Sequence, residues 1–474
     1  MQQNQFRNRC RPFTLSSGLV LVVVLFIAGP TRVLAQATAG GHVDPSDYLY
    51  KLGFTFQPAS TCSNVNCHGA AAGGVKKNKV REAKTDSFTL WNADGTPDAP
   101  PDPHHSAFKE LSTAAGKAIA QKMGIARAAG DAKCISCHAL NPPEALLKPA
   151  KPGDPPFKVS DGVSCNACHG PSGTWTPLHD KQPDAAKSWA VSQQAALGGH
   201  EQLLKKFGFF NTRPLIERAQ RCASCHLAID PQMVAAGHPQ PMFELNWFSL
   251  TYSNRHWNDP HDDKDPLAPY FGARLWAAGQ VVSLHDALEQ LAARAEVAGT
   301  ADREVFGAYN QAMSHYTVFS PAFSTGAIKG SMTEVAAQVT AARVVLVGGP
   351  AKRPDLAKSA HAAAAAVEKL YDATRSYEPT QESTLKLVAV LVKQTTTADT
   401  LGGFGIEQQR DAIFALYNAY ATSPGAPKAA TDTRDAIGQK LFPQDAGGKL
   451  IKPEKVPPAD FKKALGEVKA AVGA

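Results

Sequence analysis

Four cysteine pairs, each with a histidine directly after its second cysteine, constrain this chain more than any other feature of its sequence. The four units are Cys62/Cys67-His68, Cys134/Cys137-His138, Cys165/Cys168-His169 and Cys222/Cys225-His226. They use eight of the nine cysteines in the chain, and the remaining one, Cys10, lies near the N-terminus. A cysteine pair alone is compatible with a disulfide or with half of a zinc site, so the repeated histidine is the informative residue.

The spacing of three of these units favours covalent attachment of c-type haem. Two thioether bonds to the porphyrin vinyl groups require two sulfurs that point the same way, and a Cys-x-x-Cys step of about one helical turn provides this. The histidine that follows is then held beneath the ring as the proximal iron ligand. Zinc would need four ligands that converge on one point, and it does not require a histidine after every pair. We therefore expect His138, His169 and His226 to bind haem iron.

The first unit differs because four residues separate Cys62 from Cys67. An ordinary disulfide between these two cysteines is the alternative interpretation. A longer loop can bulge outward while both sulfurs still reach the vinyl groups, and His68 stands in the expected place. We therefore expect this unit to carry haem as well, which gives four covalently bound haem c groups.

The N-terminus predicts a secretory signal peptide over residues 1–35. A short basic region precedes an apolar run from Leu19 to Ala28, and the segment ends in small residues at Ala35. The apolar run is too short to span a bilayer, and no later segment is apolar enough to do so. The mature chain is expected to be exported, either to the periplasm or out of the cell, without a transmembrane segment.

The charge of the chain gives little support to nucleic-acid binding. Removing residues 1–35 takes away four arginines and no acids, so that the formal net charge falls from +7 to +3. No cluster of lysine and arginine is interleaved with aromatic residues. The pattern favours a mixed, solvated surface over a nucleic-acid interface.

Composition divides the mature chain near residue 270. Residues 36–270 hold the remaining cysteines and many Pro- and Gly-rich loops, whereas residues 271–474 are alanine-rich and free of cysteine. The predicted fold class is mainly α, with a loop-rich multihaem cytochrome c domain followed by an α-helical domain. Helical spacing predicts one helix over 106–124 and another over 275–299. In the second of these, Val281, Leu284, Leu288 and Leu291 are predicted to pack in the core.

The sixth iron ligand decides between electron transfer and substrate chemistry. His179 follows the third unit closely, so that we expect it to cap a neighbouring haem and not its own. His104, or its neighbour His105, stands at the start of the predicted helix 106–124, and His238 lies in an AGHP turn. For each of these, a surface or core histidine is the alternative. Two histidines that share an iron should face each other across about twice a 2 Å bond.

Part of the chain resembles a known family. The run from DPHHSAFKEL through CISCHAL and DGVSCNACHGPSGTWTPLH to CASCHLAIDPQMVAAGHP resembles the multihaem c-type cytochromes related to the tetrahaem electron acceptor of hydroxylamine oxidoreductase, the cytochrome c-554-like family. The resemblance covers roughly residues 55–260. It implies a mainly helical, loop-rich domain with closely stacked haems that are mostly bis-histidine ligated. The distal ligands would be His104, His179 and His238, and His179 would cap the first haem.

The resemblance also implies that the haem on Cys134 and Cys137 has an open or undetermined sixth position, which His42 or His256 could fill. This sequence departs from the family in the two extra residues of CSNVNCH. It departs again at the segment YNQAMSHY, residues 309–316, where glutamine and serine stand in place of the cysteines of a further haem motif in some relatives. That segment suggests a lost haem, and we expect His285, His315 and His361 beyond the haem motifs not to bind iron.

These features together predict an exported tetrahaem c-type cytochrome that carries single electrons between a donor and an acceptor protein, an electron-transfer role that is favoured over an enzymatic one without excluding it. One alternative is a multihaem enzyme, or a catalytic subunit, that uses an open haem on a small nitrogen compound. A second alternative is a structural or assembling cytochrome in a larger complex or filament, so that oligomer formation stays open.

Overall fold

The mainly α prediction is confirmed. The computed structural model describes residues 49–50, 53–63, 87–92, 102–148, 155–180, 200–251 and 269–474. Within these residues the chain forms helices and no β-strand, apart from isolated bridges between Phe56 and Leu147 and between Gln444 and Leu450. The predicted signal peptide, residues 1–35, lies outside the described residues.

The cysteine-rich segment consists of short helices joined by loops. Its elements are η2 Ala59–Cys62, α2 Ser87–Asn92, α3 Pro103–Glu110, α4 Ala114–Lys122, η3 Ala128–Gly130, α5 Ala132–His138, η4 Glu144–Leu146, η5 Val159–Asp161, α6 Cys165–His169, α7 Ser172–Asp180, α10 His200–Lys206, α11 Leu215–His226, α12 Pro231–Ala235 and α13 Leu245–Thr251. Between Leu49 and α10, the described apolar side chains form three small clusters, which include Leu111, Phe56 and Phe88 respectively.

The single helix predicted over 106–124 is wrong, because the chain forms two helices there. Helix α3 ends at Glu110, and α4 begins at Ala114. The hydroxyl of Thr113 accepts a hydrogen bond from the backbone N–H of Gly116, which caps the start of α4. An apolar period alone does not report such a break, because the cap is made by a residue that also fits a helix interior.

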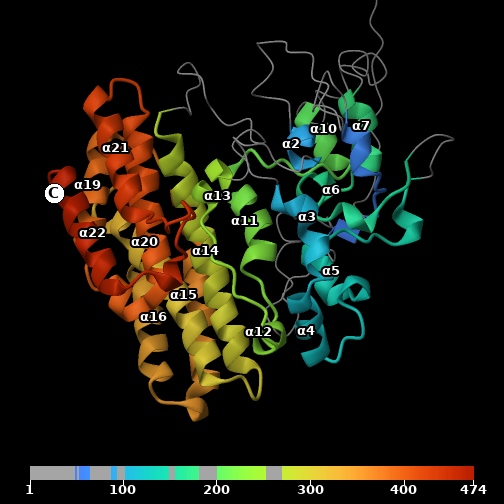
Figure 1. Cartoon of the computed structure of the whole chain (residues 1–474), viewed down its shortest axis with the longest axis horizontal. Coiled ribbons are helices and arrows are strands. Elements are labelled where there is room, and N and C mark those ends of the chain that lie inside the picture. Colours follow the sequence, from blue (N-terminus) through green and yellow to red (C-terminus); the bar gives the residue numbers. More distant parts are fainter. Residues whose placement is uncertain are drawn as a thin grey trace, which may run out of the picture. The chain divides into compact units, whose positions relative to one another are not determined.

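The alanine-rich segment forms a bundle of longer helices (Figure 1). Its elements are α14 Phe271–Glu296, α15 Asp302–Ser324, α16 Thr333–Leu346, η6 Pro350–Lys352, α17 Arg353–Glu368, α18 Tyr371–Arg375, α19 Gln381–Leu391, α20 Thr397–Ala421, α21 Lys428–Leu441, η7 Pro453–Lys455 and α22 Pro458–Ala471. The predicted boundary at residue 270 falls directly before the start of α14.

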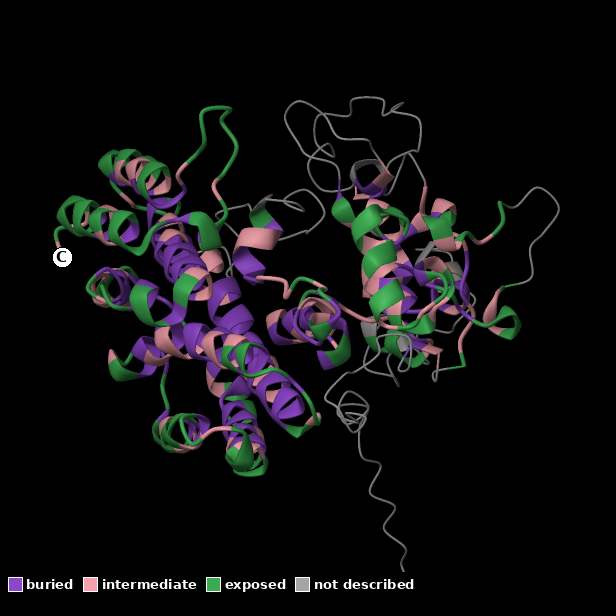
Figure 2. Ribbon diagram, turned by 60° about the horizontal axis from the view of Figure 1, so that its bottom comes forward, coloured by how far each residue is buried: buried purple, intermediate pink, exposed green. Residues whose placement is uncertain are grey.

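Helix α14 is the central element of this bundle, and it packs against α15, α17 and α20. The four predicted core positions, Val281, Leu284, Leu288 and Leu291, are each fully buried, which confirms that prediction. Buried residues follow the inner faces of the long helices, and exposed residues follow the outer faces (Figure 2). The apolar period of the sequence therefore encodes the bundle core directly.

The end of the cysteine-rich segment is packed onto α14. Helices α11 and α13 both contact α14, and Ile216 and Ala223 of α11 belong to the same apolar core as the bundle. A Cβ atom added to Gly279 of α14 would stand 2.7 Å from the Cβ of Leu245, the first residue of α13. Glycine at this position therefore allows the two helices to approach closely.

This close approach gives a stability prediction. Gly279→Ala is expected to lower the free energy of unfolding by about 1–3 kcal/mol, because the added methyl group overpacks the contact with Leu245. The matched control is Gly307→Ala in α15, where nothing lies within 4 Å of the added Cβ. That change should raise the free energy of unfolding by about 0.5–1 kcal/mol. Urea unfolding of both variants measures the two effects, and equal changes in both would contradict the packing argument.

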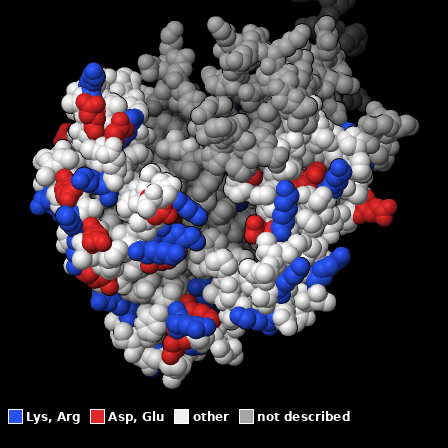
Figure 3. All heavy atoms as spheres, in the orientation of Figure 1, with Lys and Arg blue, Asp and Glu red and all other residues white. Residues whose placement is uncertain are grey.

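The described helices include none that is both long and apolar enough to cross a bilayer. On the face shown in Figure 3, lysine and arginine side chains are interspersed with aspartate and glutamate. The described surface in this view is therefore mixed in charge.

Candidate functional site

The three units with two-residue spacing adopt the same local structure. His138, His169 and His226 are the last residues of α5, α6 and α11. Because each unit forms a helical turn, its two cysteines and its histidine lie close together along one short stretch of backbone. The side chain of Asp131 accepts a hydrogen bond from the backbone N–H of Lys133 and thereby caps α5.

His104 faces His226. The centroids of the two imidazole rings are 6.2 Å apart, and the ring planes are nearly perpendicular at 89°. His104 comes from the first turn of α3, and His226 ends α11. The fold thus brings a predicted distal histidine opposite the histidine of the Cys222/Cys225 unit.

His238 faces His138 in the same way. Their ring centroids are also 6.2 Å apart, with an angle of 78° between the ring planes. The resemblance had implied an open position here, or one filled by His42 or His256. Both of those histidines lie outside the described residues, and the structure instead places His238 opposite His138.

The spacing of both pairs matches two imidazoles that share one metal ion. Two metal-to-nitrogen bonds of about 2 Å take up about 4 Å of the 6.2 Å between the centroids. The remaining distance is about 1 Å for each ring, which equals the distance from the centre of an imidazole ring to its nitrogen. The measured separation is therefore the one expected for a shared metal ion. No group of three or more His, Cys, Asp and Glu side chains in the described part of the chain is arranged to hold a metal ion by itself. A haem iron needs just two protein ligands, because the porphyrin supplies the other four nitrogens.

Hydrogen bonds orient three of the four rings. The Nδ1 atom of His104 lies 2.9 Å from Oδ1 of Asp102, that of His138 lies 2.9 Å from the carbonyl oxygen of Ala107, and that of His238 lies 2.8 Å from the carbonyl oxygen of Pro239. Because the partners are acceptors, Nδ1 carries the proton and donates it. The lone pair of Nε2 is then free for a metal, which is the usual arrangement of metal-binding histidines.

Burial favours the neutral form of His226 and His238. It lowers the pKa of His226 to about 3, with a smaller contribution from the charge of His104. Burial also lowers the pKa of His238. A neutral imidazole is the form that binds iron, so both rings are already in the binding form at neutral pH.

Helix α3 links the two pairs. Its His104 faces one histidine, and the carbonyl oxygen of Ala107, one turn later, holds the ring of the other. The turn around η5 lies against α3, since Val163 N–H donates to the carbonyl of His104 at 2.9 Å. Gly162 has a φ of +67°, and a Cβ atom there would stand 2.5 Å from the carbonyl oxygen of His104. Glycine is therefore required for this approach.

One cavity contains both pairs. It has a volume of about 520 Å³, and mostly apolar side chains line it. Its lining includes the two complete units and both facing histidines, namely Cys134, Cys137, His138, Cys222, Cys225, His226, His104 and His238. A planar apolar group that reacts with the thiols and binds between the histidines fits this lining.

Cys168 and Cys222 have thiols that stay protonated at neutral pH. None of the seven cysteines within the described residues forms a disulfide, which leaves their sulfurs available for other covalent bonds. Burial raises the pKa of Cys168 to about 11 and that of Cys222 to about 12. Zinc binds thiolates, whereas a thioether is neutral, so that this environment suits thioether attachment better.

Sulfurs of different units also meet. The thiol of Cys225 donates a hydrogen bond to Cys137, which raises the pKa of Cys225 well above its usual value, and burial raises it further. The thiol of Cys165 donates in the same way to Cys62 at the end of η2. The attachment points of neighbouring units are therefore adjacent, as stacked cofactors require.

The other predicted residues are placed in part. The ring of His169 stacks on Phe209 with 6.0 Å between centroids, and His105 packs edge-on against Trp91 at 4.4 Å. His179 belongs to α7, and its side chain lies outside the described part of the chain, as do Cys67 and His68. The helical bundle contains His285, His315 and His361, and none of them lines the cavity.

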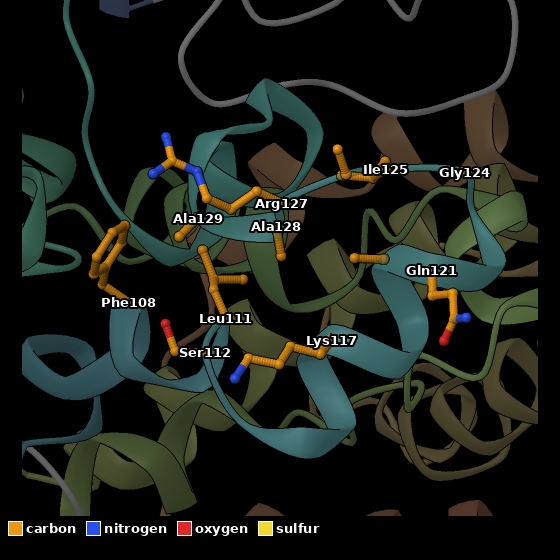
Figure 4. Close-up of a pocket in the computed structure, with 12 residues that line it drawn as sticks. Phe108, Leu111, Ser112, Lys117, Gln121, Gly124, Ile125, Arg127, Ala128 and Ala129 are labelled. Atoms are coloured by element: carbon orange, nitrogen blue, oxygen red, sulfur yellow. The ribbon is translucent and has the colours of Figure 1, made fainter.

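A second cavity, of about 770 Å³, opens beside the first (Figure 4). Lys117 and Gln121 of α4 line it, together with Arg127. Leu111 and Ala128 line both cavities and therefore form part of the wall between them.

Sequence reasoning missed the residues that hold the rings. Phe243 stacks on His226 at 5.2 Å with an angle of 23°, and Phe248 packs edge-on against the same ring at 5.3 Å. The carbonyl of Ala107 has no sequence signal at all. Asp102 has one, because an acidic residue two positions before a histidine at a helix start fits both a cap and a partner for the ring.

Comparison with known proteins gives one family. Residues 101–170, a minor part of the chain, match the family described as cytochrome c554 and c-prime. No curated protein and no solved structure matches. The matched segment contains α3, α5 and α6, and with them His104 and two of the four Cys-Cys-His units. This similarity supports a c-type cytochrome with covalently bound haem that acts in electron transfer.

Proposed function

We propose that this chain is an exported tetrahaem c-type cytochrome that carries single electrons between a donor and an acceptor protein. The proposal depends on two pairs of facing histidines, each with 6.2 Å between the ring centroids. Both pairs lie in one cavity, which the Cys134/Cys137 and Cys222/Cys225 units line. The similarity of residues 101–170 to cytochrome c554 and c-prime supports the same class of protein.

These contacts support an assignment of the iron ligands. His138 and His238 would bind the iron of the haem attached to Cys134 and Cys137. His226 and His104 would bind the iron of the haem attached to Cys222 and Cys225. The remaining assignments rest on sequence, with His169 as the proximal ligand on the Cys165/Cys168 unit, His68 as that on the Cys62/Cys67 unit, and His179 as a distal ligand.

The surroundings of the facing histidines suit electron transfer. Bound haem would supply a reversible one-electron couple at each site. On both sides of each site the chain supplies an imidazole, and hydrogen bonds to oxygen acceptors hold three of these four rings in place. An iron with two such ligands has no vacant position for a substrate, and its coordination changes little on reduction.

The adjacent units support a relay. Because Cys137 and Cys225 are in hydrogen-bond contact, two attachment points from different units lie side by side. Cys165 and Cys62 repeat the arrangement. Closely spaced haems pass electrons along a chain, and haem propionates would add negative charge that favours docking to basic partner surfaces.

The test is to express the full chain with a haem-attachment system and to count haems. The proposal expects four covalently bound haems per chain, low-spin spectra, and stepwise uptake of four electrons in a redox titration. Recovery of the protein from the periplasm or medium tests export. Colourless protein, or cysteines bridged to each other or bound to zinc, would overturn the haem assignment. A high-spin haem that binds nitric oxide rapidly in the unmodified protein would favour the enzyme alternative instead.

A further inference from the structure

A cluster of three carboxyl groups is buried where α13 and α20 meet, outside the cysteine-lined cavity. Glu244 directly precedes α13, and Glu407 and Asp411 belong to α20. Their exposed fractions are 1%, 7% and 2%, and the neighbouring Arg410 is 6% exposed. Fully ionised, the cluster would carry three negative charges against one positive charge in a buried site, which is strongly unfavourable.

Hydrogen bonds join this cluster to the ring that packs on His226. The side chain of Gln408 donates to the carbonyl oxygen of Phe243 at 3.1 Å and to Glu407 at 3.2 Å. Phe243 stacks on His226, as described above, and its neighbour Glu244 accepts the backbone N–H groups at the start of α13. The carboxyl cluster is thus directly adjacent, through the peptide bond between Phe243 and Glu244, to a ring in contact with the proposed iron ligand.

Neutral groups face the cluster from the other side. Gln280 of α14 donates to the side-chain oxygen of Gln408 at 2.9 Å, and His315 of α15 donates from Nδ1 to the oxygen of Gln280 at 2.9 Å. Burial lowers the pKa of His315 to about 3, so that it is uncharged. The charges that act on the three carboxyls are therefore their own and that of Arg410.

The cluster has an acceptor atom without a partner. Asp411 is paired with Arg410 through Oδ1 at 3.1 Å, but its buried Oδ2 has no hydrogen-bond partner among the described residues. Burial raises the pKa of Glu244 to about 8 and that of Asp411 to about 6, and the pKa of Glu407 lies well above its usual value for the same reason. At neutral pH the cluster is thus partly protonated and can gain or lose a proton.

We propose that the cluster of Glu244, Glu407 and Asp411 takes up one proton from solvent when the iron held by His226 accepts an electron from the donor protein. The proposal rests on the haem assignment above. The added electron makes the site more negative, which favours the protonated carboxyl, and protonation in turn favours the reduced iron by the same free energy. The balance is one electron from the donor and one proton from water, bound as the carboxyl O–H.

The test is a redox titration of the holoprotein at several pH values between 5 and 9. Because reduction binds a proton, the midpoint potential of one haem should fall as pH rises through the range near pH 6–8. The limit for one proton per electron is a tenfold change in the redox equilibrium constant per pH unit, which corresponds to 59 mV. The double variant Glu244→Gln/Glu407→Gln leaves Asp411 as the only carboxyl of the cluster, so the dependence should be lost above about pH 7 and persist only near the pKa of Asp411, which burial raises to about 6.

The matched control is Glu334→Gln/Glu382→Gln, which makes the same change in net charge at two exposed glutamates of the bundle and should leave the pH dependence intact. Proton release on oxidation of the unmodified protein, followed with a pH indicator in weak buffer, should give up to one proton and needs no variant to fold. Potentials that do not change with pH, or a slope between about pH 7 and pH 9 that is unchanged in the double variant, would overturn the proposal while leaving the haem assignment standing. Absence of haem would overturn the haem assignment first.

Discussion

His238→Ala is expected to convert one low-spin haem into a high-spin haem that binds carbon monoxide when reduced. His238 faces His138 at 6.2 Å, so its removal leaves the proposed iron of the Cys134/Cys137 unit with a vacant sixth position. The surrounding cavity is large and mostly apolar, and it leaves room for a small ligand. Titration with carbon monoxide should show the number of binding haems rising by one per chain, and electron paramagnetic resonance should show a new high-spin ferric signal.

The control for this variant is His361→Ala. His361 lies in the bundle, its Nδ1 atom is 2.9 Å from a carboxylate oxygen of Glu289, and it does not line the cavity. It should leave all spectra unchanged. If His238→Ala binds no more carbon monoxide than the unmodified protein, the pairing of His238 with His138 does not involve iron. The resemblance would then be right that this haem lacks a histidine on its second side.

Cys222→Ala/Cys225→Ala is expected to remove one haem per chain and to destabilise the protein strongly. The two thiols line the shared cavity, and His226 beside them packs against Phe243 of the segment that meets α14. Without this haem, part of the cavity is left unfilled. His226 and His104 also lose the iron that both would bind. Because binding free energy is also folding free energy, the free energy of unfolding should fall by more than about 4 kcal/mol.

Mass spectrometry and the absorbance of extracted haem measure the loss, and chemical denaturation measures the destabilisation. Ser224→Ala is the matched control, since Ser224 lies between the two cysteines without attaching haem, and its hydroxyl bonds to the carbonyl oxygen of Arg221 and to the Cys225 thiol. It should keep the full number of haems. An unchanged haem count in the double cysteine variant would show that this unit carries none.

The sequence indicates the chemistry of the site more completely than its geometry. The Cys-x-x-Cys-His spacing predicts the attachment sites, because covalent attachment demands residues that are local in sequence. The three described histidines of these units each end a helix, as that local spacing requires. Which distal histidine faces which unit depends on contacts between segments far apart in the chain, and no local pattern encodes them. The facing of His104 to His226 is one such contact.

The same distinction holds for the bundle. The apolar period of α14 predicted its buried positions, because a repeated pattern along one helix reports the face that packs. It did not predict the carboxyl cluster, since Glu244 and Glu407 are polar residues that a sequence pattern assigns to the surface. Their burial follows from the meeting of α13 and α20. The break between α3 and α4 was missed because a threonine cap resembles an ordinary helical residue.

Helix α3 makes the two central sites mechanically dependent on each other. The side chain of His104 in its first turn faces His226, and the backbone carbonyl of Ala107 one turn later holds the ring of His138, so that both proposed iron sites depend on this helix. Because a helix is stiff, α3 would fix the distance between the two proposed iron sites. Tunnelling rates depend steeply on that separation. Any substitution that unwinds α3 should therefore shift the midpoint potentials of both proposed haems and slow electron transfer between them.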